Sequence, residues 1–261
     1  MTLAIGVVAC LVAAVAAVRS TWSPCGLSML STITPMGEQS RRNRFRTTAG
    51  WFAVGSVLGG AALGAAMAGL AAGYDALGVS KLGSGVALAV AALICAASDA
   101  RLGGFQLPIH RRQVNEHWLD RFRAWVYGFG FGCQIGFGLA TYIIAAALYL
   151  MIVSSVLSGS LLVALAAGTI FGLVRGASVL LGRRVTHPAA LLSLHRNLAR
   201  MDSAARRVVV LADIGAGLTV LCLLWPTVLV AATGASVLLV VSVPVFKPKV
   251  RRTPRVEHAS S

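Results

Sequence analysis

The sequence predicts an all-α fold, a polytopic helical membrane protein, from three observations. Of its 261 residues, 57% are hydrophobic and only 12% are charged, whereas a soluble domain carries about 25% charged residues. Its 28 glycines stand in long Ala-, Val- and Leu-rich tracts, which are typical of helices that pack closely in lipid. Apolar segments of roughly 20 residues, enough to cross the bilayer core, recur along the chain. We therefore expect six or seven transmembrane helices.

The first predicted span begins at Thr2 and stays largely uncharged as far as Met36. That length is too great for one straight crossing of a hydrocarbon core about 30 Å thick. Proline removes a backbone donor and clashes with the preceding helical turn, so we expect breaks at Pro24 and Pro35.

The later spans are separated by polar loops. We expect them at residues 47–73, 82–98, 124–157, 161–182 and 208–246. The span at 124–157 is again too long for one crossing, and its glycines between 128 and 138 predict an early break. The segment 208–246 would be about 58 Å long as a helix, so we divide it near Pro226 into two spans.

The positive charge is concentrated between the spans. The net charge is +15, and such a strongly basic chain invites comparison with nucleic-acid-binding proteins. However, most Lys and Arg residues lie in four segments: 37–46, 99–123, 183–207 and the tail from 247. The positive-inside rule then predicts a plasma-membrane protein with its N-terminus outside and its C-terminus in the cytoplasm. Anionic lipid headgroups are the expected partner of these charges, and nucleic acid is not.

The domain organisation follows from the span pattern. We expect a single transmembrane domain at 1–246, followed by a basic cytoplasmic tail at 247–261. Spans one and four are both long and broken, and they run in opposite directions. That arrangement is typical of a 3+3 inverted repeat, with repeat one at about 1–98, repeat two at about 124–224 and an extra span at 226–246.

Two of the five cysteines, Cys25 and Cys133, lie in the two broken spans. The unpaired backbone N–H groups of a broken helix stabilise a thiolate, so the pair is a candidate for thiol–disulfide exchange. Arg19 precedes Cys25 and would add a favourable charge, although it equally fits an interfacial arginine that snorkels. No cluster of Cys and His has the spacing of a metal site.

Around these cysteines the sequence resembles the CcdA/DsbD transmembrane family. The resemblance rests on Ser23-Pro24-Cys25 and on Cys133 after a run of aromatic residues and glycines. Family members usually have proline where Gly132 stands. The resemblance implies that Cys25 and Cys133 are a catalytic redox pair, supported by Pro24 and Gly132. The implied activity is that of a thiol–disulfide oxidoreductase without a cofactor. It would pass reducing equivalents from cytoplasmic thioredoxin to an extracytoplasmic thioredoxin-like protein, as in cytochrome c maturation.

Two further hypotheses stay open. Arg175 and Asp213 are ionisable residues inside predicted spans, which by default marks a functional site. They would either pair with each other or line a cavity, and a cavity would favour a secondary transporter or exporter of a small ion or solute. The third hypothesis is a non-catalytic assembly subunit that retains the fold.

Overall fold

The protein is described by a computed structural model over residues 2–108 and 121–224, and within these ranges its regular elements are all helical. The α-helices are α1 (Thr2–Arg19), α2 (Pro24–Thr32), α3 (Pro35–Ser40), α4 (Phe45–Ala76), α5 (Lys81–Ala100), α7 (Ala124–Phe137), α8 (Ala147–Leu157), α9 (Leu161–Ala177) and α10 (Pro188–Leu224). The 3-10 turns are η1 (Ser20–Trp22), η2 (Leu102–Gly104) and η3 (Ser178–Arg184). The predicted span at 226–246 and the tail at 247–261 lie outside the described residues.

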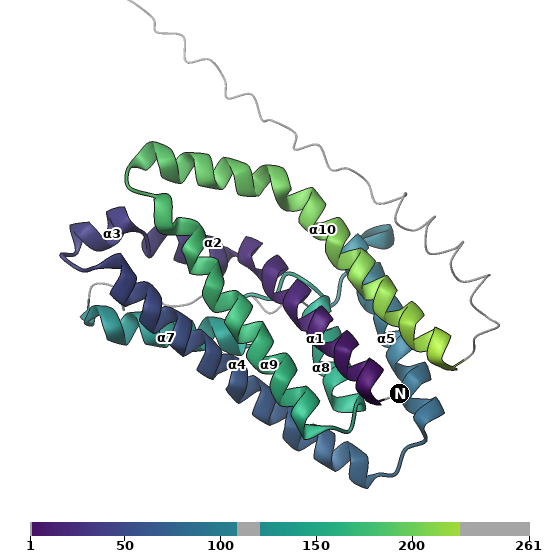
Figure 1. Ribbon diagram of the computed structural model, residues 1–261. Helices are drawn as coiled ribbons and strands as arrows, with labels where there is room; N and C mark the ends of the chain where they lie inside the picture. The colour runs from purple at the N-terminus through teal and green to yellow at the C-terminus, as the bar shows by residue number, and fades with distance from the viewer. Residues whose placement is uncertain (1, 109–120, 225–261) are drawn as a thin grey trace, which may run out of the picture.

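The prediction of a helical membrane protein agrees with the lengths of these helices. Four segments of the described chain are long and apolar enough to cross a membrane: Leu3–Trp22, Phe45–Ala76, Lys81–Ala100 and Leu161–Arg184. α8 is apolar but shorter. Figure 1 shows these helices as a bundle in which α1 lies inside, with α10 along one side.

The break predicted in the first span is confirmed. α1 ends at Arg19, and α2 begins at Pro24 after one 3-10 turn. The Ser23 side chain caps α2 by accepting a hydrogen bond of 3.1 Å from the Gly26 amide, and Pro24 occupies the first turn, where its missing N–H has no cost. A second break precedes Pro35, where Thr34 accepts a hydrogen bond of 3.0 Å from the Gly37 amide.

The break predicted in the fourth span lies at the last of its glycines. α7 continues through Gly128, Gly132 and Gly136 and is ended by Gly138, whose φ of 69° falls in the region that favours glycine. A non-helical segment then leads to α8. The span is therefore divided as predicted, and the earlier glycines do not interrupt it.

Close packing explains why α7 carries these glycines. A Cβ on Gly132 would overlap the carbonyl oxygen of Phe52 in α4, and one on Gly136 would overlap that of Ser56. Further along α4, a Cβ on Gly60 would overlap the Gly168 carbonyl in α9. α4 is thus in near backbone contact with both α7 and α9, and side chains at these positions would separate the helices.

The polar loop predicted at 183–207 is wrong from Pro188 onward, because this segment is the first half of α10. The His187 Nδ1 accepts a hydrogen bond of 3.2 Å from the Ala190 amide at the start of the helix. His195 lies 3.2 Å from the Ser31 hydroxyl in α2. The arginines from Arg196 to Arg207 that were counted as loop charges are therefore held on a helix that packs against α5 and α1 (Figure 1).

These glycine contacts generate a stability prediction. We expect Gly132→Ala and Gly136→Ala each to lower the thermal unfolding midpoint of the detergent-solubilised protein by several degrees. Overpacking a tight contact costs about 1–3 kcal/mol, and each kcal/mol shifts the midpoint by about 2–4 °C in a chain of this size.

Gly50→Ala and Gly69→Ala are matched controls, because an added Cβ would meet nothing within 4 Å at either position. Both lie inside α4, where alanine is the better helix former. The thermal unfolding midpoint of these two variants should therefore be unchanged or higher. Equal destabilisation by all four substitutions would contradict the packing explanation.

Candidate functional site

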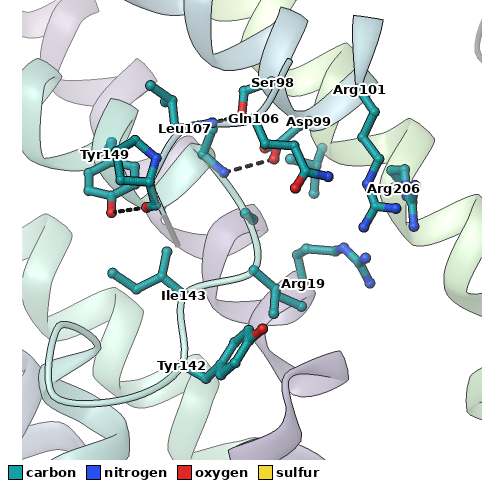
Figure 2. A pocket seen from close by; sticks show the side chains of 15 residues that line it. Arg19, Ser98, Asp99, Arg101, Gln106, Leu107, Tyr142, Ile143, Tyr149 and Arg206 are labelled. Carbon is teal, nitrogen blue, oxygen red and sulfur yellow. Dashed lines mark hydrogen bonds between the residues drawn. The ribbon is translucent and has the colours of Figure 1, made fainter. Parts of the chain in front are cut away.

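A cavity of about 140 Å³ lies where α1, α5 and α10 meet the segment before α8. Figure 2 shows three arginine side chains pointing toward its interior: Arg19 from the end of α1, Arg101 from just after α5, and Arg206 from α10. The wall opposite the arginines includes Tyr142 and Tyr149. Among the described residues, these three arginines are the basic side chains that line the cavity.

Two of the arginines share one carboxylate. Asp202 of α10 accepts from the Arg19 Nη1 at 2.7 Å through one oxygen and from the Arg206 Nη2 at 3.3 Å through the other. Arg19 also lies over the Trp22 ring at 5.8 Å. Because Arg19 is only 7% exposed, this pairing holds a buried guanidinium in a fixed position.

The third arginine lies in an unusual backbone conformation. Arg101 has φ 55° and ψ 42°, and its amide closes the last turn of α5 by bonding to Ala97 and Ser98. Within the described residues Arg101 makes no ion pair. Partial burial lowers its pKa, and the positive charges of Arg206 and Arg19 lower it further, yet an arginine stays protonated at neutral pH.

The carboxylate of Asp99, in the wall of the cavity, already accepts hydrogen bonds through both of its oxygens. The two oxygens of Asp99 accept hydrogen bonds from the amides of Ala146 and Ala147, at 2.8 and 3.1 Å. These amides belong to the first turn of α8, where backbone donors have no helical partner and a negative charge is favoured. Asp99 therefore fixes α8 against α5, and its charge is directed to the helix terminus.

The two ionisable residues predicted inside the spans do not contact each other. Arg175 donates from Nε to the Ile135 carbonyl at 3.4 Å and lies in electrostatic range of Cys25. Asp213 lies beside Asp99 on the other side of the bundle. Among the described residues, the Arg175 Nη1 has no hydrogen-bond partner, whereas the Asp213 carboxyl interacts with that of Asp99.

No disulfide joins the predicted pair, Cys25 and Cys133. Cys25 is buried in the first turn of α2. Cys133 is half-buried within α7, where its backbone faces Gly55 and Gly59 of α4. Pro24 and Gly132, predicted to support redox chemistry, serve helix initiation and helix packing in the structure, as described above.

The arginine cavity was not predicted from the sequence. Of its arginines only Arg19 was a candidate, because Arg101 and Arg206 fall in segments predicted as solvated loops. One usable signal was present: Asp202 and Arg206 are four residues apart, which is the spacing of an ion pair on a helix.

The chemistry available at this site is the binding of negative charge. Three guanidiniums from three separate elements face a small cavity, and Asp99, the carboxylate among the described residues of its wall, bonds to a helix terminus. Such a field attracts anions and repels cations. Among the described residues no group of three His, Cys, Asp or Glu side chains is placed to hold a metal ion.

Several curated proteins are similar to this chain. The methylamine utilization protein MauF of Paracoccus denitrificans is 34% identical over 214 residues, covering 78% of this chain and 74% of the relative. MauF of Paracoccus versutus is 31% identical over 164 residues, covering 60% and 57% respectively. MauF of Methylorubrum extorquens is 30% identical over 148 residues, covering 54% and 50%. No protein-family profile and no solved structure matches the chain.

These relatives correct the functional predictions made from the cysteines. The assignment to the CcdA/DsbD family is wrong, because the similar proteins are named for methylamine utilization. The predicted thiol–disulfide exchange in cytochrome c maturation, with cytoplasmic thioredoxin and an extracytoplasmic thioredoxin-like protein as partners, is wrong for the same reason. The alternative of a solute transporter or exporter finds no support in these relatives either.

The shared carboxylate generates a prediction about stability. We expect Asp202→Asn to lower the thermal unfolding midpoint more than Arg206→Gln does. Removing Asp202 leaves Arg19 buried without its ion pair, whereas removing Arg206 keeps the 2.7 Å pair between Asp202 and Arg19. An unpaired buried charge is the more costly defect.

Asp75→Asn is a suitable control, since Asp75 is exposed and is in none of the ion pairs found among the described residues. The thermal unfolding midpoint of this variant should match that of the unmodified protein. A larger loss from Arg206→Gln than from Asp202→Asn would show that Asp202 does not organise the arginines.

Proposed function

The chain belongs to the family of the methylamine utilization protein MauF, and on this premise we propose that it is a membrane-embedded accessory component of methylamine utilization. We further propose that the arginine cavity is its working site. In this role the protein supports the pathway without handling the amine itself, which corresponds to the non-catalytic subunit among our sequence-based hypotheses.

This proposal rests on the positive charge of the arginines that line the cavity. An aliphatic amine has a pKa close to that of lysine, about 10.4, so methylamine is a cation at neutral pH. A cavity lined by Arg19, Arg101 and Arg206 repels such a cation. These residues favour an anionic group. The cavity is therefore not the place where methylamine, the pathway's substrate, would bind.

The proposed membrane arrangement retains the finer features of the sequence prediction. We propose six or seven crossings in a 3+3 inverted repeat, in the plasma membrane, with the N-terminus outside and the C-terminus in the cytoplasm. Two observations support it: both long spans are divided, after α1 and after α7, and the basic segments alternate with apolar helices along the chain. In this orientation the cavity lies toward the cytoplasmic ends of α1 and α5.

Growth on methylamine tests the proposal. In a host whose chromosomal copy of this gene is deleted, we expect loss of growth with methylamine as the only nitrogen source and normal growth with ammonium. A plasmid copy of the unmodified chain should restore growth. A copy carrying Arg101→Gln should restore it poorly, because this substitution removes the cavity cation that makes no ion pair among the described residues.

Arg183→Gln is the matched control, since Arg183 is an exposed arginine of η3 and does not line the cavity. It should restore growth fully, with both variants present in the membrane at equal amounts. Normal growth of the deletion strain on methylamine would overturn the pathway assignment. Full restoration by Arg101→Gln would overturn the assignment of the site.

A further inference from the structure

We propose that the arginine cavity binds a phosphate group. This inference deepens the proposed function and rests on its assignment of the working site, because it names the chemical class that the cavity accepts. Three observations carry it: the charge that remains after internal pairing, the fixed positions of the guanidiniums, and the size of the cavity.

The first observation is the charge balance. Arg19 and Arg206 share the single carboxylate of Asp202, while Arg101 contributes a third positive charge with no ion pair among the described residues. Asp99 is also in the wall, but both of its oxygens bond to the α8 terminus. The cavity therefore keeps an excess of positive charge that an anion would neutralise.

The second observation is the position of the donors. Each guanidinium has five N–H donors in a planar fork. The bonds to Asp202 use the Nη1 of Arg19 and the Nη2 of Arg206, so each keeps donors for another acceptor. Because Asp202 already fixes both side chains, little conformational entropy is lost when a ligand arrives. Figure 2 shows the Arg101 side chain beside that of Arg206, with Arg19 reaching toward both.

A phosphate group suits three converging arginines better than a carboxylate does. A carboxylate has only two oxygens, both of which a single bidentate guanidinium can engage. A phosphate has more acceptor oxygens and carries more charge at neutral pH, so it can bond to guanidiniums from several directions. Arginine is the usual residue for such bidentate recognition.

The third observation is the volume. The cavity measures about 140 Å³, close to the ~150 Å³ that accommodates a benzene-sized molecule. A phosphate group with one or two ordered waters fits this space. Gln106 and Tyr142 also line the cavity and supply neutral hydrogen-bonding groups for those waters.

A phosphate group can reach this cavity from two sources. One is free inorganic phosphate, and the other is the phosphate of a lipid headgroup, since basic pockets between membrane helices bind headgroups. Both sources present phosphoryl oxygens to Arg19, Arg101 and Arg206, and inorganic phosphate offers more oxygens and more charge than the phosphodiester of a lipid. The experiment therefore has one arm for each source.

The test uses the full chain, purified in detergent and stripped of lipid in a phosphate-free buffer. Inorganic phosphate is titrated by calorimetry in the first arm, and nanodiscs containing phosphatidylglycerol are compared by lipid-retention mass spectrometry in the second. We expect binding in at least one arm. Arg101→Gln should weaken it by about tenfold or more, the size expected for a lost charged hydrogen bond.

Two variants make the result specific. Arg101→Lys keeps the charge but loses the planar fork, so its affinity should fall between those of the unmodified chain and Arg101→Gln. Arg183→Gln, on the exposed η3 turn outside the cavity, should bind like the unmodified chain. The inference is overturned if neither arm shows binding, or if Arg101→Gln binds as tightly as Arg183→Gln.

Failure of this inference is distinguishable from failure of the proposed function. If Arg101→Gln loses phosphate binding but still restores growth on methylamine, the phosphate site stands and its role in the pathway is rejected. If Arg101→Gln abolishes growth while the unmodified chain binds phosphate in neither arm, the working site stands and the phosphate assignment is rejected.

Discussion

The near backbone contact of α4 with α7 and α9 is the constraint on which the rest of the structure depends. In lipid no hydrophobic effect draws helices together, so their association relies on van der Waals packing and interhelical hydrogen bonds. Glycines supply the packing, and Ser56 of α4 adds a hydrogen bond of 2.8 Å to the Gly172 carbonyl of α9. Once α7 is held there, it ends at Gly138, and the segment that follows is placed to form one wall of the arginine cavity.

Two acidic residues, Glu38 and Asp202, also hold the helices together. The carboxylate of Glu38 in α3 accepts hydrogen bonds of 2.6 Å from Thr48 of α4 and from Tyr127 of α7, which ties three elements together. Asp202 joins α10 to α1 through Arg19. Partners of this kind offset the cost of burying a charge. The cavity differs because its positive charge exceeds its internal compensation, so it is the place where an external anion gains most.

The sequence was sufficient for the features set by hydropathy and proline. The membrane helices and the break between Arg19 and Pro24 follow from apolar length and from a missing backbone donor, which are local properties. The glycine run in α7 was misjudged, because glycine weakens an isolated helix yet is required where another backbone approaches. That approach depends on α4, far away in sequence, and no local pattern reveals it.

The arginine cavity could not be predicted from the sequence for the same reason. Arg19, Arg101 and Arg206 come from three separate elements, and their convergence depends on how α1, α5 and α10 pack. Cys25 and Cys133 attracted attention because they share a local setting of helix breaks and glycines. In the structure that setting has packing causes of its own, such as the contact of Gly132 with Phe52.

The central claim is that binding of an anion in the arginine cavity underlies the role in methylamine utilization. Its most direct test compares phosphate affinity with growth rate on methylamine across one series of graded cavity variants: Arg19→Lys, Arg101→Lys, Arg206→Lys and Arg206→Gln. The claim predicts that growth declines in the same order as affinity, with membrane levels equal. Growth that stays constant while affinity falls, or that falls while affinity is unchanged, would contradict it.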